Sequence, residues 1–133
     1  MTGRALTRIM LVEDEEDIQT VAKLALEAIG GFTVETCSSG KQALAAAPTF
    51  APDLILLDVM MPDLTGPSTL QAMRANPELE KIPVIFMTAK VQSHEVSEYR
   101  AMGALGVIPK PFDPLTLANL IRQIWNEAHA APH

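Results

Sequence analysis

The stretch from Leu54 to Gly66 limits the possible folds of this chain more than any other. Its first four residues, 54–57, are all large and apolar, which is typical of a strand buried on both faces in the middle of a parallel sheet. Asp58 follows directly, and Gly66 precedes Pro67, a residue suited to the first turn of a helix. Because open α/β sheets bind ligands at the carboxyl ends of their strands, Asp58 is predicted to lie at a functional site.

Other segments predict the rest of a sheet. Residues 9–12, 84–87 and 107–108 are short apolar runs, and residues 32–36 alternate apolar and polar side chains, as an edge strand does. Pro109 fits only an edge strand, where a missing N–H breaks no ladder. Helical spacing or capping signals predict helices over residues 18–29, 41–47, 68–75, 93–102 and from 117 to about 127.

Strands and helices therefore alternate five times, with crossovers long enough for parallel pairing. We expect a doubly wound α/β fold: a five-stranded parallel sheet in the flavodoxin-like order 2-1-3-4-5, with helices on both faces. Pro48 and Pro52 are expected in the loop before the central strand. One domain over residues 1–133 is expected, with a core over about 8–128 and frayed ends at 1–7 and 129–133.

Composition excludes several classes of function. A formal charge of −6 and a pI near 4.9 argue against nucleic acid or an anionic membrane as a partner. Cys37 is the only cysteine, so no internal disulfide forms and a reducing compartment is expected. No apolar run approaches the ~20 residues that span a bilayer. Residues 1–8 do not resemble a signal peptide, and we expect a cytoplasmic protein.

Ionisable or hydroxyl side chains lie at the ends of four of the five expected strands. Glu13 and Asp14 follow the first strand, Asp58 follows the third, Thr88 follows the fourth and Lys110 follows the fifth. Each has an ordinary structural explanation, as a helix-capping acid, a turn-forming aspartate, a strand-end hydroxyl or a solvated lysine. None of these explanations requires the residues to face one another. In the expected sheet all of them lie along one edge, with strands one and three adjacent.

Three neighbouring carboxylates repel one another unless a cation joins them, and an all-oxygen set favours Mg²⁺ over zinc. A lysine ammonium and a hydroxyl opposite them suit a phosphoryl group. Asp58 is then a candidate nucleophile that forms an aspartyl phosphate, with Thr88 and Lys110 each contacting a phosphoryl oxygen.

With this pattern the sequence resembles the receiver domain of two-component response regulators, in particular the single-domain chemotaxis regulators, over about residues 8–128. The motifs that show the resemblance are Leu-Val-Glu-Asp-Glu (11–15), Leu-Leu-Asp-Val-Met-Met-Pro-Asp-Leu-Thr-Gly (56–66), Met-Thr-Ala-Lys (87–90), Gly-Ala-Leu-Gly (103–106) and Pro-Lys-Pro-Phe (109–112).

The resemblance implies specific roles. Asp58 would accept a phosphoryl group from a phosphohistidine on a sensor histidine kinase or a histidine phosphotransfer protein. Asp14 would bind Mg²⁺ directly, Glu13 mainly through water, and Met60 through its main-chain carbonyl. The Lys110–Pro111 peptide bond would be cis.

The resemblance also implies a switch, in which the threonine moves inward and a residue three before the lysine, often aromatic, follows it. Here that residue is Val107, which puts the usual aromatic switch in doubt. We expect Thr88 to affect the fourth helix, fifth strand and fifth helix through main-chain shifts around residues 89–94.

The leading interpretation is a phosphorylation-controlled binding module: a stand-alone receiver, monomeric or weakly dimeric, that acts on an unknown downstream protein and catalyses only its own phosphorylation and dephosphorylation. One alternative is a receiver-like scaffold that works without phosphorylation. The other is an aspartate-nucleophile phosphatase of the haloacid dehalogenase type, but those enzymes have a second aspartate where this chain has Met60. Trp125 is expected in the core rather than at an interface.

Overall fold

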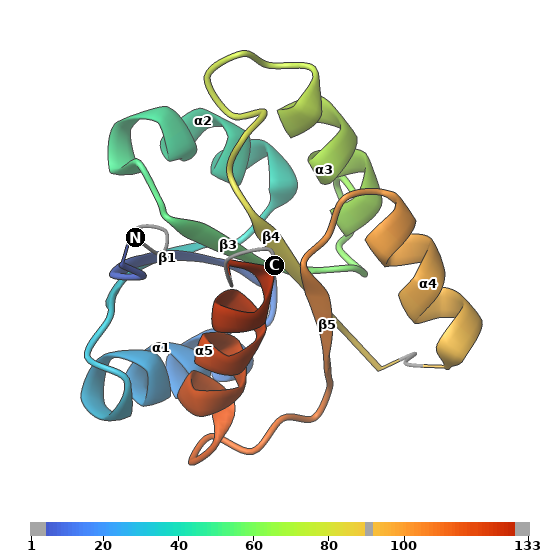
Figure 1. Ribbon diagram of the computed structural model, residues 1–133. Helices are drawn as coiled ribbons and strands as arrows, with labels where there is room; N and C mark the ends of the chain where they lie inside the picture. The colour runs from blue at the N-terminus through green and yellow to red at the C-terminus, as the bar shows by residue number, and fades with distance from the viewer. Residues whose placement is uncertain (1–4, 90–91, 130–133) are drawn as a thin grey trace.

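A computed structural model describes residues 5–89 and 92–129 (Figure 1). Within that part, five parallel strands form one sheet in the order β2-β1-β3-β4-β5, which confirms the predicted topology. The strands are β1 (Arg8–Val12), β2 (Thr33–Cys37), β3 (Leu54–Asp58), β4 (Val84–Thr88) and β5 (Gly106–Pro109). The helices are α1 (Glu16–Leu24), which continues into the π-helical segment η1 (Ala25–Ile29), then α2 (Gly40–Phe50), α3 (Gly66–Arg74), α4 (Ser93–Ala101) and α5 (Leu117–Ala128).

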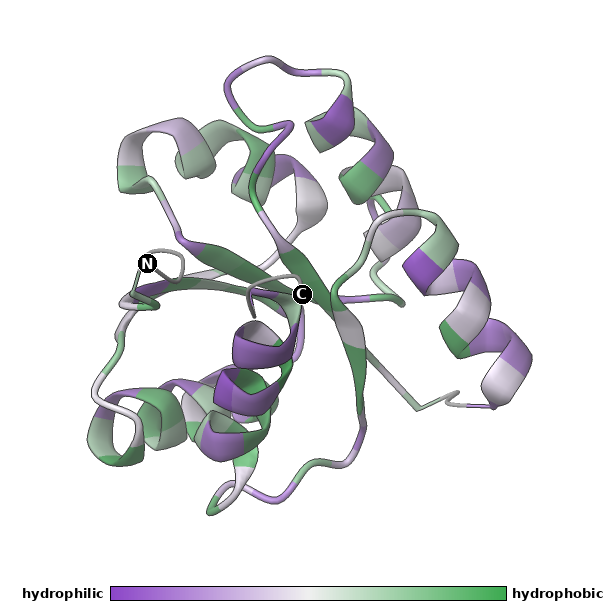
Figure 2. Ribbon diagram, in the orientation of Figure 1, coloured by the Kyte–Doolittle hydropathy of each residue, from purple (hydrophilic) through white to green (hydrophobic). Residues whose placement is uncertain are grey.

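The sheet separates two hydrophobic cores. Helices α1 and α5 cover one face, and α2, α3 and α4 lie on the other (Figure 1). Every residue of β3 and β4 is buried, and successive side chains point to opposite faces, so that Leu56 packs with α1 and α5 and Leu57 packs with α2 and α3. The central strands are therefore apolar up to their last residues, Asp58 and Thr88, while the helices carry both polar and apolar residues (Figure 2).

The strand register aligns the carboxyl ends of the strands. Val12 pairs with Leu57, Asp58 with Met87, and Thr88 with Pro109. The residues that follow these strands therefore emerge at one edge of the sheet, although they are separated by up to about a hundred positions in the sequence. Pro109 belongs to the edge strand β5, as predicted.

Helix α2 extends further than predicted. We expected it to end at Ala47, but it continues through Pro48 to Phe50 and is closed by Ala51 in the left-handed conformation (φ 54°). Pro48 cannot donate its own helical hydrogen bond, but the Ala51 N–H still donates to the Ala47 carbonyl at 2.8 Å. The extra turn buries the Phe50 ring, which also lies 4.2 Å from the Arg8 guanidinium, and this packing offsets the lost bond.

Leu6 and Thr7 pack against the rest of the domain. We expected residues 1–7 to be frayed, but Leu6 is buried in the core and Thr7 donates two hydrogen bonds to the Asp53 carboxylate. At the other end, His129 stacks on Trp125 and its N–H donates to the Trp125 carbonyl. Trp125 itself is buried, as predicted. Residues 1–4 and 130–133 lie outside the described part. No helix in the described part is both long and apolar enough to cross a membrane.

Candidate functional site

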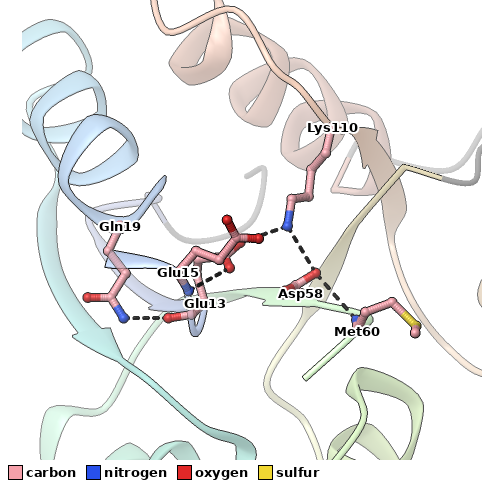
Figure 3. Close-up of polar contacts among 6 residues, drawn as sticks. All are labelled: Glu13, Glu15, Gln19, Asp58, Met60 and Lys110. Carbon is pink, nitrogen blue, oxygen red and sulfur yellow. Dashed lines mark hydrogen bonds and ion pairs between the residues drawn. The ribbon is translucent and has the colours of Figure 1, made fainter. Parts of the chain in front are cut away.

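Asp58 ends β3 with only 2% of its surface exposed. Its Oδ1 accepts a hydrogen bond from the Met60 N–H at 3.4 Å and lies 3.4 Å from the Lys110 Nζ (Figure 3). The loop that follows returns closely to the strand, because the Gly66 N–H donates to the Val59 carbonyl at 2.9 Å. Burial raises the pKa of the Asp58 carboxyl, and the neighbouring Lys110 opposes that effect without cancelling it.

Glu13 and Asp14 follow β1 directly. Glu13 is fully buried; its Oε2 accepts from the Glu15 N–H at 3.0 Å and its Oε1 accepts from the Lys110 Nζ at 3.0 Å. Burial raises the Glu13 pKa despite both of these bonds. Asp14 is half-buried, and one carboxylate oxygen from each of Glu13, Asp14 and Asp58 lies within 4.8 Å of the others. These three acids therefore form one cluster.

Lys110 reaches this cluster from the opposite side. It follows β5, and its N–H donates to the Thr88 carbonyl at 2.9 Å, which holds the chain beside β4. The Lys110–Pro111 peptide bond is cis. Burial acts to lower the Lys110 pKa, but the hydrogen bond to Glu13 and the charge of Asp58 outweigh it and raise that pKa. The ammonium group is thus held in its charged form between two carboxylates.

The remaining predicted residues occupy the rim of the site or lie behind it. Thr88 ends β4 and is buried, and Ala89 after it is exposed. Met60 is 70% exposed beside Asp58. Val107 is half-buried and packs against the core on the α2–α4 face. Lys90, the last residue of the 87–90 motif, lies outside the described residues.

Sequence reasoning missed two residues near the site. The Gln19 side chain donates to the Glu13 carbonyl and, at 3.1 Å, to the Ser38 hydroxyl, so it ties the loop after β1 to the loop after β2 (Figure 3). Tyr99 of α4 packs its ring edge-on against Phe86 of β4, with ring centroids 5.0 Å apart. Neither position had a sequence signal, because a polar residue on an amphipathic or exposed helix is usually solvated.

The acidic cluster suits a hard divalent cation. All three donors are carboxylate oxygens, and two of the three acids are almost fully buried. Burial raises the pKa values of Glu13 and Asp58 although the Lys110 ammonium lies beside both carboxylates. A further positive charge at this point would stabilise the ionised carboxylates, and Mg²⁺ matches this oxygen donor set.

A doubly wound sheet with a buried aspartate, an acidic cluster and a lysine at its carboxyl edge defines the class of phosphoacceptor signalling domains. The chain belongs to the response regulator receiver domain family, whose model matches residues 9–122. It is a signalling module of that family.

The chain is similar to known members of the family in both sequence and structure. It is 36% identical over 119 residues to the probable transcriptional regulator ycf29 of Porphyra purpurea, a match that covers 87% of this chain and 55% of that protein. It is 33% identical over 123 residues to the phosphate regulon transcriptional regulatory protein PhoB of Rhizobium meliloti, covering 92% and 54%. The chain thus spans about half the length of the curated relatives it matches.

Among solved structures, the chemotaxis response regulator CheY4 of Vibrio cholerae superposes with a TM-score of 0.82 at 30% identity, over 90% of this chain and 99% of that one.

Proposed function

We propose that this chain accepts a phosphoryl group on Asp58 from a phosphohistidine of a sensor histidine kinase or a histidine phosphotransfer protein, in a Mg²⁺-dependent reaction. Phosphorylation then changes the binding of a downstream protein to the face formed by α4, β5 and α5. The observation that supports this best is the position of the Lys110 Nζ, 3.4 Å from Asp58 and 3.0 Å from Glu13, against a cluster of three acids.

The proposed reaction is a displacement at phosphorus. An Asp58 carboxylate oxygen forms a bond to phosphorus, the bond from phosphorus to the donor imidazole nitrogen breaks, and that imidazole leaves with the electron pair. Lys110 binds one phosphoryl oxygen and the Thr88 hydroxyl donates to another. Asp58 must be ionised to attack, so a second cation beside it favours the reactive form.

Asp14 would hold Mg²⁺ directly, Glu13 mainly through water, and Asp58 and the Met60 carbonyl would complete the protein ligands. When bound there, Mg²⁺ supplies the positive charge that offsets the charge of the transferred phosphoryl oxygens. Gln19 fixes the Glu13 main chain and so positions the acidic pair.

A groove beside the site supports docking of a donor protein. It has a volume of about 240 Å³ and is lined by apolar side chains of α1 together with the segment after β5. Its lining residues are Asp17, Ile18, Val21, Lys110, Pro111 and Phe112. Lys110 belongs to both the groove and the acidic cluster, so a protein that fills the groove brings its phosphohistidine close to Asp58.

Intact-mass measurement after incubation with acetyl phosphate and Mg²⁺ tests the proposal. We expect the mass of one phosphoryl group to be added to the wild type, to be absent with EDTA, and to be absent from Asp58→Asn. The control Asp113→Asn changes an exposed aspartate whose carboxylate accepts the Leu115 N–H at 2.9 Å, so it should be labelled like the wild type.

A wild type that acquires no phosphoryl group under these conditions would contradict the proposal and favour a phosphorylation-independent scaffold. Continuous hydrolysis of a phosphoester substrate would instead favour a phosphatase.

A further inference from the structure

We propose that Asp63 is a positioning residue for the Mg²⁺ site: it fastens the loop between β3 and α3 to the first turn of α2, and so fixes the main chain of Met60. This inference rests on the proposed function, in which the Met60 carbonyl is a ligand of the ion.

The loop between β3 and α3, residues 59–65, lies mostly at the surface. Val59 and Met61 are buried in it, whereas Met60 is 70% exposed. The bond from the Gly66 N–H to the Val59 carbonyl closes the loop at its base, at 2.9 Å. That bond does not fix the rest of the loop, and Mg²⁺ requires its ligands in nearly ideal octahedral positions. A loop that supplies a ligand therefore needs a second attachment.

Asp63 supplies that attachment. Its Oδ2 accepts a hydrogen bond from the Lys41 N–H at 3.2 Å, although the two residues are 22 positions apart in the sequence. Lys41 is the second residue of α2, so its N–H has no partner within the helix, and the helix dipole favours a carboxylate there. Slight burial acts to raise the Asp63 pKa, but main-chain hydrogen bonds, the one from Lys41 among them, lower it. Asp63 therefore accepts this bond as a carboxylate.

The first turn of α2 is a well-fixed anchor for the loop. The Ser39 hydroxyl caps the helix by accepting from the Gln42 N–H at 3.1 Å. A Cβ added to Gly40 would clash with the Thr69 hydroxyl and lie 3.1 Å from Leu64 Cβ. The start of α2 is thus in direct contact with α3 and with the residue that follows Asp63.

The same turn is also connected to the acidic pair after β1. The Ser38 N–H donates to Gln42 Oε1 at 2.8 Å, and the Ser38 hydroxyl accepts from the Gln19 side chain at 3.1 Å. Gln19 in turn donates to the Glu13 carbonyl (Figure 3). Hydrogen bonds therefore join the start of α2 to both loops that carry the proposed ligands, with Asp63 as the link to the second. Binding of the ion should consequently be felt in α2.

Titration of ¹⁵N-labelled protein with Mg²⁺, followed by amide resonances, tests the role of Asp63 without a phosphodonor. In the wild type, the Lys41 amide resonance should shift along the same binding curve as that of Asp14. In Asp63→Ala, the dissociation constant for Mg²⁺ should rise about three- to tenfold, because the loop loses its bond to α2. The Lys41 shift on binding should also fall.

Two variants separate this bond from charge and from helix stability. Asp63→Asn removes the charge but keeps an acceptor oxygen, so the dissociation constant should stay within about twofold of the wild-type value and the Lys41 shift should persist. Ser39→Ala removes the α2 cap and leaves Asp63 in place. It should lower the urea midpoint and keep the dissociation constant within about twofold of the wild-type value.

A wild-type dissociation constant in Asp63→Ala would overturn the role of Asp63. Equal weakening in Asp63→Asn would overturn it too, because charge alone would then explain the effect, and equal weakening in Ser39→Ala would assign the effect to helix stability. Absence of Mg²⁺-dependent shifts at Asp14 and Asp58 in the wild type would instead contradict the proposed function itself.

Discussion

Replacing Asp58 with asparagine should stabilise the protein when divalent cations are absent. The burial that raises the Asp58 pKa means that folding disfavours the ionised carboxylate at neutral pH. Asparagine has nearly the same shape, keeps an oxygen to accept from the Met60 N–H and removes the charge. The substitution therefore relieves an unfavourable charge without creating a cavity.

The expected gain can be worked out from the distances. At an effective dielectric constant of about 20, the attraction between Lys110 and Asp58 at 3.4 Å is about 5 kcal/mol. The repulsion from Glu13, at no more than 4.8 Å, is at least about 3.5 kcal/mol, and the half-exposed Asp14 adds a smaller, screened amount. The attraction to Lys110 and the repulsion from the two acids nearly cancel, so the cost of burial decides the difference. Burying a carboxylate costs several kcal/mol, which is more than burying an amide costs. We expect a net stabilisation of about 1–2 kcal/mol.

Urea unfolding in EDTA, followed by fluorescence of the buried Trp125, measures this difference. With Mg²⁺ at 100 times its dissociation constant, the wild type should gain about 2.7 kcal/mol and the variant less, so the order of stabilities should reverse.

Asp53→Asn is the matched control, since Asp53 is a buried acid just before the same strand. Its Oδ2 accepts from Thr7 N, Thr7 Oγ1 and Arg8 N at 2.9–3.0 Å, so this change should destabilise by about 1–3 kcal/mol. A lower urea midpoint for Asp58→Asn than for wild type in EDTA would refute the reasoning.

Three further outcomes are expected. Gly66→Ala should cost about 1–3 kcal/mol in urea unfolding and weaken Mg²⁺ binding in a titration, because its Cβ would lie 2.6 Å from the Asp58 carbonyl oxygen and 2.9 Å from Val59 Cα. Leu56→Ala, at a fully buried site, should cost about 2–5 kcal/mol in the same assay. Burial raises the Cys37 pKa to about 11, so iodoacetamide should label it near neutral pH only after unfolding. Because the folded state keeps a proton that the unfolded state releases, unfolding free energy should fall as pH rises from about 9 to about 11.

The sheet could be predicted because each strand has its own local signature. Residues 54–57 and 84–87 are uninterrupted apolar runs of strand length, and a strand covered on both faces hides such a run from water. When strands alternate with helices, right-handed crossovers leave few possible strand orders in the sheet. In each of these orders the carboxyl ends of the parallel strands lie along one edge. That convergence is why Glu13, Asp58 and Lys110 could be placed together from the sequence.

What could not be predicted depends on contacts between distant residues. Pro48 indicates a helix end by its local chemistry, and only the burial of Phe50 and its contact with Arg8 shows why the helix continues. Leu6 and Thr7 look like an unstructured end until Asp53 is placed beside them. Tyr99 belongs to a helix with no apolar stripe, so its ring contact with Phe86 has no trace in the sequence pattern.

The division of the protein by its sheet has a consequence for how partners assemble. The groove beside Lys110 is built by α1 and the segment after β5, whereas α4 and Tyr99 lie across the sheet from α1. A donor seated in that groove leaves α4 uncovered, so donor and target need not compete for the α4 part of the target face, although α5 lies on the same side of the sheet as the groove. A three-component complex would form during the lifetime of the acyl phosphate, and raising the donor concentration should not displace a target bound at α4.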